Sequence, residues 1–329
     1  MVSKSVLLTC NAIKSLKIQG ARNIAKAAVK ALAHQAKSSR ARNASEFISE
    51  LLEAADILAS SRPTEPMLRN SLRKALRFVF FRLNLENTED ISVLKERMEH
   101  EAREFESNMR RNSERIAEIG SKLIPKNSVV LTHCHSSTVT AILIRASETR
   151  GIKQVVCTET RPLLQGRITA KELHNAGIKC TLIADSAVRA SIAEFRPAVV
   201  IVGSDAISVS GELINKIGTS QIAELANSRG IPFYCAAEIY KFDPATIWGK
   251  MEDIEARPKE ELLSTLKPSS SLKGSFFGGI KLKGVDAFNP AFDRTEAKLI
   301  TSYITELGIF PPQSLSGIVS SELGIKNPI

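Results

Sequence analysis

The spacing of apolar residues in the first third of the chain predicts α-helices. In ASEFISELLEAADILAS, apolar side chains recur at steps of three and four, so they share one helix face, made of Phe47, Leu51, Ala54 and Leu58. Asn43 or Ser45 can cap the start of this helix. A longer stripe then runs through densely charged sequence and comprises Ile91, Leu94, Met98, Phe105, Met109 and Ile116. It predicts a long helix against a partner surface, and we expect a helical N-terminal domain over residues 1–120.

The hydrophobic pattern changes after residue 126. Short runs rich in Val and Ile, namely NSVVLTHC, KQVVCTET, KCTLIAD, AVVIVGSDAI and PFYCAAE, alternate with helical patterns. Continuous hydrophobicity indicates strands that are covered on both faces, as in a parallel sheet with crossover helices. We therefore expect an α/β fold, in which residues 121–329 form a doubly wound, mostly parallel Rossmann-like domain. Its C-terminal extension, from residue 242, should be folded but irregular, with exposed segments suited to subunit packing.

Polar side chains gather at the ends of the predicted strands. In a doubly wound sheet the ligand crevice lies outside the carboxyl ends of the strands, where the strand order reverses. The residues at those ends are Cys134 to Ser137, Glu159 to Arg161, Asp185, Asp205, Glu238 and Lys241. Packing alone does not explain so many ionisable groups beside apolar strands, so this edge is our candidate site.

The charge of the chain is unevenly distributed. The net charge is +10, and residues 1–85 hold 15 Lys and Arg against 5 Asp and Glu, whereas residues 86–329 hold 30 of each. Such an excess suits nucleic acid, an acidic partner or a small polyanionic substrate. Aromatic residues make up only 5% of the chain and no stacking motif is present, which argues against nucleic acid.

The remaining composition points to a cytoplasmic protein. No apolar run approaches the ~18–20 residues that span a bilayer, so we expect no membrane contact. The five cysteines are far apart and include no CxxC pair, which indicates neither a disulfide framework nor a zinc site.

Cys134 lies in THCHSS, at a strand end and directly before a helix start. A helix start favours anions, so the pKa of this thiol should be lowered and Cys134 can act as a base. The alternative is a buried structural thiol, because most cysteines in strands belong to the core. His133 and His135 flank Cys134, and we expect no metal ion to be shared between them.

Two further stretches carry candidate ligand groups. In VVIVGSDAISVSGELINKIGTSQIA, Asp205 is either a cap or, because burial favours the protonated acid, a proton donor. We expect Asn215 and Lys216 to open the following helix and to hold sugar hydroxyls and a phosphate. In TETRPLLQGRITAKEL, the polar side chains either lie on a solvated loop or contact a phosphate or carboxylate; they are Arg161, Gln165 and Arg167.

Five ordered motifs, THCHS, ETRPLLQGR, VGSDAI, NKIGT and YKFDP, resemble the initiation-factor-2B-related family. That family includes archaeal ribose-1,5-bisphosphate isomerases, methylthioribose-1-phosphate isomerases and regulatory subunits of a translation-initiation exchange factor. The resemblance extends to KSLKIQGARNIAKAA near the start and NPAFDRTEAKLITSYITELGIFPPQ near the end, and so spans nearly the whole chain. The loop lacks the inserted Ala and the Trp of the form RPLLQGARLTAWEL that methylthioribose-1-phosphate isomerases usually have, so the archaeal bisphosphate branch is nearer.

The resemblance implies the roles of individual residues. Cys134 matches the proton-accepting Cys and Asp205 the proton-donating Asp, a pair that the regulatory subunits generally lack. The positions that match substrate-binding positions are Gly20, Ala21, Arg22, Arg62, His135, Ser136, Ser137, Asn215, Lys216 and Lys241. Gln19 departs from the pattern, since related isomerases commonly carry Arg there.

The implied reaction is the conversion of ribose 1,5-bisphosphate to ribulose 1,5-bisphosphate in nucleotide salvage, without a metal or organic cofactor. The resemblance also implies a homo-oligomer, either a dimer or a trimer of dimers, and activation by a nucleoside monophosphate. The alternatives are a methylthioribose-1-phosphate isomerase and a non-catalytic regulatory subunit.

Overall fold

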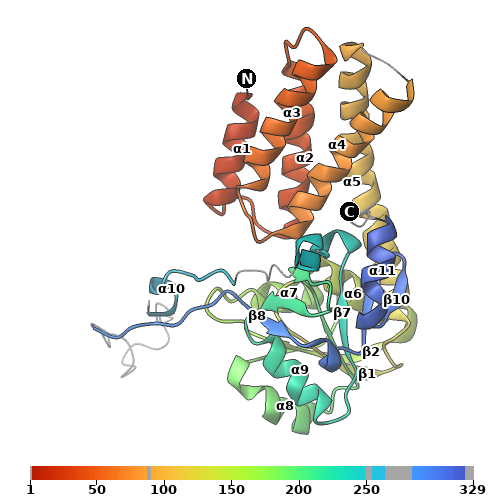
Figure 1. Ribbon diagram of the computed structural model, residues 1–329. Helices are drawn as coiled ribbons and strands as arrows, with labels where there is room; N and C mark the ends of the chain where they lie inside the picture. The colour runs from red at the N-terminus through yellow and green to blue at the C-terminus, as the bar shows by residue number, and fades with distance from the viewer. Residues whose placement is uncertain (1, 87–89, 249–253, 264–283, 323–329) are drawn as a thin grey trace.

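The structure is a computed structural model that describes residues 2–86, 90–248, 254–263 and 284–322. The N-terminal helices stand above an α/β part (Figure 1). Residues 254–263, which include α10 (Glu260–Leu263), extend to one side and are called the arm below. No helix among the described residues is both long and apolar enough to cross a membrane.

The N-terminal part is a bundle of helices packed through apolar faces. These helices are α1 (Lys4–Lys14), α2 (Ala21–Ser38), α3 (Ala44–Ala59), α4 (Pro66–Glu86) and α5 (Ile91–Ser121). The predicted face of α3 is fully buried, and the Asn43 side chain caps the helix by accepting a hydrogen bond from the Glu46 N–H. The predicted stripe on α5 is buried apart from Ile91. Both helical predictions are therefore confirmed.

Within the described residues, the α/β part is built on a seven-stranded sheet. Its strands are β1 (Ser128–Thr132), β2 (Ile152–Thr158), β3 (Cys180–Ile183), β4 (Val199–Val202), β7 (Phe233–Ala236), β9 (Ser302–Thr305) and β10 (Gly308–Phe310). The order is β10-β9-β7-β4-β1-β2-β3, and all neighbours are parallel except β10 with β9. The predicted fold class is confirmed, and the strand order reverses between β1 and β4.

Both faces of this sheet are covered, as the continuous apolar runs require. Along β1, Val130 faces one apolar cluster together with helix α6 (Ser137–Arg150), whereas Val129 and Leu131 face another. The second cluster continues without a break into the N-terminal helices. The helical and α/β parts therefore share one core, while the domain boundary at residue 120 stays a prediction.

A small antiparallel sheet lies beside the main one. Its strands are β5 (Ala206–Ile207), β6 (Leu213–Lys216) and β8 (Phe292–Thr295). Asn215 and Lys216 end β6 and pair with Asp293 and Phe292 of β8. The prediction that they open a helix was wrong, because ladder pairing with a distant strand holds them extended, and α9 (Thr219–Asn227) begins only after Gly218 at φ 102°.

The C-terminal extension is more regular than the sequence suggested. After β8, strands β9 and β10 extend the main sheet, and α11 (Pro312–Glu322) packs on it. The prediction of an irregular tail was wrong for this part, because β9 is paired along its length with β7. Much of the Gly-rich run FFGGIKLKG lies outside the described residues.

Asn70 ties helix α4 to the chain that follows β7. Its side-chain amide is buried and donates hydrogen bonds to the carbonyl oxygens of Tyr240 (2.9 Å) and Phe242 (2.7 Å), on either side of Lys241. Asn70→Ala leaves both carbonyls without this donor, so we expect the free energy of unfolding to fall by about 1–3 kcal/mol in urea titrations. The exposed Asn227→Ala is the matched control, and an equal effect of both variants would contradict this role.

Candidate active site

A cavity of about 410 Å³ lies at the carboxyl ends of β1 and β4, where the strand order reverses. The N-terminal helices supply its opposite wall. The residues expected from the sequence that line it are Gln19, Gly20, Ala21, Arg22, Arg62, Cys134, His135, Ser136, Ser137, Gln165, Asp205, Asn215, Lys216 and Lys241. The fold thus brings together segments separated by more than 200 positions.

Not every predicted residue lines this cavity: Glu159 and Arg167, which form an ion pair at 3.0 Å, lie outside it, and so does Arg161. Its backbone N–H donates to the carboxylate of Asp185 at 2.7 Å, and the neighbouring N–H of Thr160 donates to the same carboxylate at 2.8 Å. Asp185, which does not line the cavity, therefore fixes the loop after β2. With the loop held this way, the wall is made by Leu163, Gln165 and Ile168 instead.

Cys134 sits in a tight turn between β1 and α6. Its φ of 64° lies in the left-handed region, which is unfavourable for a residue with a Cβ and is common at functional sites. Two threonines hold this turn: the Cys134 N–H donates to Thr160 Oγ1 at 3.0 Å, and Thr169 Oγ1 donates to the Cys134 carbonyl at 2.9 Å. The backbone is thereby fixed while the thiol lines the cavity.

The Cys134 thiol is protonated at neutral pH in the free protein. Burial raises its pKa to about 11, the charge of Asp205 adds to this, and the charge of Lys216 opposes it. The expected lowering of the Cys134 pKa by the helix start was wrong, because removal of the thiolate from water outweighs the favourable dipole.

The histidines beside Cys134 are engaged in hydrogen bonds. His133 is buried, and its Nε2–H donates to the carbonyl of Ile217 at 2.9 Å, so its Nδ1 accepts from the Thr158 hydroxyl at 2.6 Å. Burial lowers the pKa of His133, which keeps the ring neutral. The side chain of His135 instead meets Thr169 Oγ1, at 3.1 Å from its Nδ1. Among the described residues, no group of three or more His, Cys, Asp or Glu side chains could hold a metal ion.

A glycine permits the close packing of β4 against the start of α6. A Cβ at Gly203 would lie 2.7 Å from the Cβ of Ser136. The Ser136 side chain caps α6 by accepting from the Val139 N–H at 3.4 Å. The start of α6 lines the cavity through Ser137 and Thr138, and a helix start favours an anion.

Asp205 and Lys241 come from the ends of neighbouring strands. Asp205 follows β4, and its N–H donates to the carbonyl of Ile214 in the small sheet at 3.0 Å. Lys241 follows β7, and its ammonium donates to the carbonyl of Ser204. An acid and a cation at the strand ends thus line the same cavity as Cys134.

Lys216 and Asn215 enter the cavity from β6. The Lys216 ammonium lies 4.7 Å above the centre of the Phe292 ring, and the Asn215 amide donates to Thr219 Oγ1 at 3.0 Å. The start of α9 is capped by Asp293, which accepts from the N–H groups of Gly218 (2.7 Å) and Ser220 (3.2 Å).

The junction of α1 and α2 contributes Arg22, which is paired with an acid, and the uncharged Gln19. Arg22 forms an ion pair with the buried Glu238 at 3.1 Å and donates to the carbonyl of Met109 at 2.5 Å. Gly20, at φ 81°, precedes α2, and the Gln19 amide folds back to donate to the carbonyl of Leu16 at 2.9 Å.

Glu65 is a buried acid that sequence reasoning missed. It lines the cavity, and its Oε1 has no hydrogen-bond partner among the described residues. Burial raises its pKa to about 7, opposed by the charges of Lys241 and Arg62 and increased by that of Asp205. Its position three residues after Arg62 was the only hint in the sequence that Glu65 belongs to the site. That spacing does not show that the side chain is buried.

The fold defines a doubly wound α/β protein with a cavity at the switch point, lined by cationic side chains from both the N-terminal and the α/β parts. The model of the Initiation factor 2 subunit family matches residues 17–312. The chain belongs to this family, and the resemblance drawn from its motifs is confirmed.

Individual relatives within this family carry different names. Ribose 1,5-bisphosphate isomerase of Methanocaldococcus jannaschii is 41% identical over 316 residues, which cover 96% of this chain and 94% of that protein. Methylthioribose-1-phosphate isomerase of Pelotomaculum thermopropionicum is 37% identical over 310 residues, which cover 92% and 81%. The solved structure of the translation initiation factor eIF-2B of Pyrococcus horikoshii OT3 matches with a TM-score of 0.73 at 29% identity, covering 94% of this chain and 98% of that one.

The raised pKa of Cys134 predicts slow alkylation in the free protein. We expect its reaction rate with iodoacetamide to rise about tenfold per pH unit from pH 6.5 to 9.5 without reaching a plateau, because the thiolate fraction keeps rising below a pKa of about 11. Mass spectrometry of the peptide that contains Cys134 measures the rate. Lys216→Gln should slow the reaction further, and a plateau below pH 9 would contradict the burial effect.

The raised pKa of Glu65 predicts a stability that falls as pH rises. Between pH 4.5 and about 7 the folded protein keeps the Glu65 proton, whereas the unfolded chain has lost it. Glu65→Gln should therefore become more stable than the wild type across this window, by at most about 3 kcal/mol above pH 7. Urea titrations at several pH values test this, with the exposed Glu148→Gln as control. A constant difference between Glu65→Gln and the wild type would contradict it.

Proposed function

We propose that this protein isomerises ribose 1,5-bisphosphate to ribulose 1,5-bisphosphate, in the salvage of nucleotides. The observation that carries the proposal is the meeting of Cys134 and Asp205 in one cavity with several cationic side chains. The name of the relative from Methanocaldococcus jannaschii, at 41% identity over nearly the whole of both chains, supports the same substrate.

The reaction needs two proton-handling groups. A ribose phosphorylated at C1 is locked as a ring, so forming the ketose requires ring opening and movement of a hydrogen from C2 to C1. In our mechanism the Cys134 thiolate removes the proton from C2, and the electron pair forms the C1–C2 double bond. The bond from C1 to the ring oxygen breaks, and Asp205 donates its proton to that oxygen.

The second half of the reaction restores both groups. The Cys134 thiol returns its proton to C1, and the Asp205 carboxylate accepts the proton of the C2 hydroxyl, which becomes the ketone. Each group therefore acts once as an acid and once as a base, so no outside proton donor, metal or organic cofactor enters the balance.

The protonated thiol of the free protein fits this scheme if Cys134 and Asp205 share one proton. Passing the proton from Cys134 to Asp205 yields the thiolate base together with the protonated acid, without any change in total charge. Asp205 raises the pKa of Cys134 through its negative charge, and protonation of Asp205 removes that effect. Lys216, whose charge favours the thiolate, stabilises the product of this transfer.

The remaining cavity residues can hold the two phosphates and the sugar hydroxyls. Phosphate groups suit the free N–H groups at the start of α6 and the side chains of Arg22 and Arg62. Asn215, Lys216 and Lys241 border the strand ends and can bind the hydroxyls and a phosphate. His135, Ser136 and Ser137 complete the wall beside Cys134.

A methylthioribose-1-phosphate isomerase is the second candidate, favoured by the 37% identity to the protein of that name. Its substrate differs at C5, where a neutral thioether replaces the phosphate. The several cations around this cavity favour a bisphosphate instead. A regulatory subunit would bind a ligand without converting it.

We also infer the setting of the enzyme from its family. We infer that the protein forms a homo-oligomer, either a dimer or a trimer of dimers. We also infer that it is cytoplasmic and that a nucleoside monophosphate activates it. Gel filtration and assays with and without AMP test the assembly and the activation.

Replacement of the two proton-handling groups tests the mechanism. Cys134→Ser and Asp205→Asn should each lower kcat by about 100-fold or more, with binding of the substrate largely kept, because each removes a proton transfer. Phosphorus NMR with ribose 1,5-bisphosphate and with methylthioribose 1-phosphate measures turnover and separates the candidates. Cys180→Ser and the exposed Asp286→Asn are controls that lie outside the cavity, and full activity of either active-site variant would refute the mechanism.

A further inference from the structure

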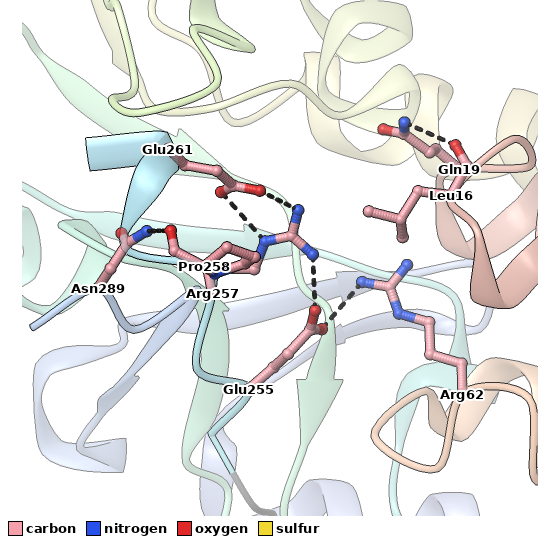
Figure 2. A network of polar contacts seen from close by, with 8 residues as sticks. All are labelled: Leu16, Gln19, Arg62, Glu255, Arg257, Pro258, Glu261 and Asn289. Carbon is pink, nitrogen blue, oxygen red and sulfur yellow. Dashed lines mark hydrogen bonds and ion pairs between the residues drawn. The ribbon is translucent and has the colours of Figure 1, made fainter. Parts of the chain in front are cut away.

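Two arginines share one carboxylate at the edge of the cavity (Figure 2). Glu255 lies 2.9 Å from Nη1 of Arg257 through Oε1, and 3.4 Å from Nη2 of Arg62 through Oε2. All three side chains line the cavity, although Glu255 and Arg257 come from the arm and Arg62 comes from the segment before α4. Each carboxylate oxygen therefore faces a different guanidinium group.

Arg257 is held in place independently of Glu255. Glu261 accepts hydrogen bonds from Nε, at 3.2 Å, and from Nη2 of the same guanidinium. The backbone is fixed as well, because the Arg257 N–H donates to the carbonyl of Asn289 at 2.9 Å, and the Asn289 amide donates to the carbonyl of Pro258 at 3.1 Å. The Arg257 side chain is only 15% exposed, so its guanidinium is oriented before any ligand arrives.

Glu255 is held less firmly than Arg257. Its side chain is 27% exposed, and the hydrogen bonds of its carboxylate go to the two arginines. Rotation of this side chain toward solvent would leave Nη1 of Arg257 and Nη2 of Arg62 facing the same space.

That space has the chemistry of a phosphate site. Guanidinium groups bind carboxylates and phosphates through the same paired N–H geometry, and a phosphate dianion carries more charge than a carboxylate. Two guanidinium groups spaced to take the two oxygens of one carboxylate are also spaced to take two oxygens of one phosphate. Gln19, across the cavity, brings no charge and is bonded to the carbonyl of Leu16.

We propose that Arg257 binds a substrate phosphate together with Arg62, and that this phosphate displaces the carboxylate of Glu255. Arg257 then provides the cation that the turn beginning at Gln19 lacks. The identity of the phosphate compound rests on the proposed function, whereas the phosphate site itself does not.

Titration calorimetry with ribulose 1,5-bisphosphate tests the two roles separately. Arg257→Gln should weaken binding about tenfold or more, because a charge-assisted hydrogen-bond donor to the phosphate is lost. Glu255→Gln should tighten binding about threefold or more, because the competing negative charge is removed. The matched controls are Arg145→Gln and Glu148→Gln, which break an exposed ion pair outside the cavity and should leave the Kd within twofold.

Two results would overturn the proposal: binding by Arg257→Gln within twofold of the wild type, or binding by Glu255→Gln that is weaker than in the wild type. The second result would make Glu255 a residue that positions the arginines. If Arg257→Gln does not fold, Arg257→Lys, which keeps the charge but loses the paired N–H groups, should still bind more weakly than the wild type.

Failure of the proposed function gives a different result. A wild type that neither converts ribose 1,5-bisphosphate nor binds ribulose 1,5-bisphosphate would refute that function. Inorganic phosphate then serves as the probe, and the phosphate site predicts weaker phosphate binding by Arg257→Gln and tighter binding by Glu255→Gln.

Discussion

The reversal of strand order between β1 and β4 is the constraint on which the site depends. Parallel strands place all their carboxyl ends at one edge, and the chain leaves β1 and β4 in opposite directions, so a gap opens between them. Cys134 and Asp205 border this gap although 71 positions separate them. The N-terminal helices close the gap from the other side because they share the apolar core of one sheet face.

Closing the gap removes its side chains from water, and this desolvation controls their protonation. It raises the pKa of the Cys134 thiol to about 11 and that of Glu65 to about 7, since neither anion is favoured in a buried place. Nearby cations act in the opposite direction in both cases, Lys216 at Cys134 and Lys241 at Glu65. The reactivity of the site is therefore set by the balance between burial and a few placed charges, and a substrate that adds negative charge shifts that balance.

The sequence predicted those parts of the structure that local pattern and strand geometry determine. The faces of α3 and α5, the parallel strands and the gathering of polar groups at the strand ends follow from periodicity alone. The pairing of β6 with β8 does not, because it depends on a segment about 80 positions away, and Asn215 and Lys216 were therefore assigned to a helix. Strand β9 was missed for the same reason.

Burial and charge pairing were equally hidden from the sequence. Glu65 follows Arg62 in what reads as an ordinary polar turn, and only the packed structure shows that it is buried. The sign of the Cys134 pKa shift was misjudged because the dipole of a helix start can be inferred from the order of elements, whereas the extent of desolvation cannot. Arg257 lies on a segment without hydrophobic periodicity and was not considered for the site.

The cations that line the cavity are paired with carboxylates, and this pairing determines which ligands they can bind. Around the cavity, Arg22 forms an ion pair with Glu238 and Arg62 forms one with Glu255, while the charge of Lys241 lowers the pKa of Glu65. Cations that are partly removed from water need such counterions in the free protein, because unpaired they would destabilise the fold. A ligand must therefore offer more than a carboxylate does, in charge or in number of oxygens. A phosphate dianion meets that requirement, whereas a neutral sugar or a single carboxylate does not, so under the proposed function the paired carboxylates favour phosphorylated ligands.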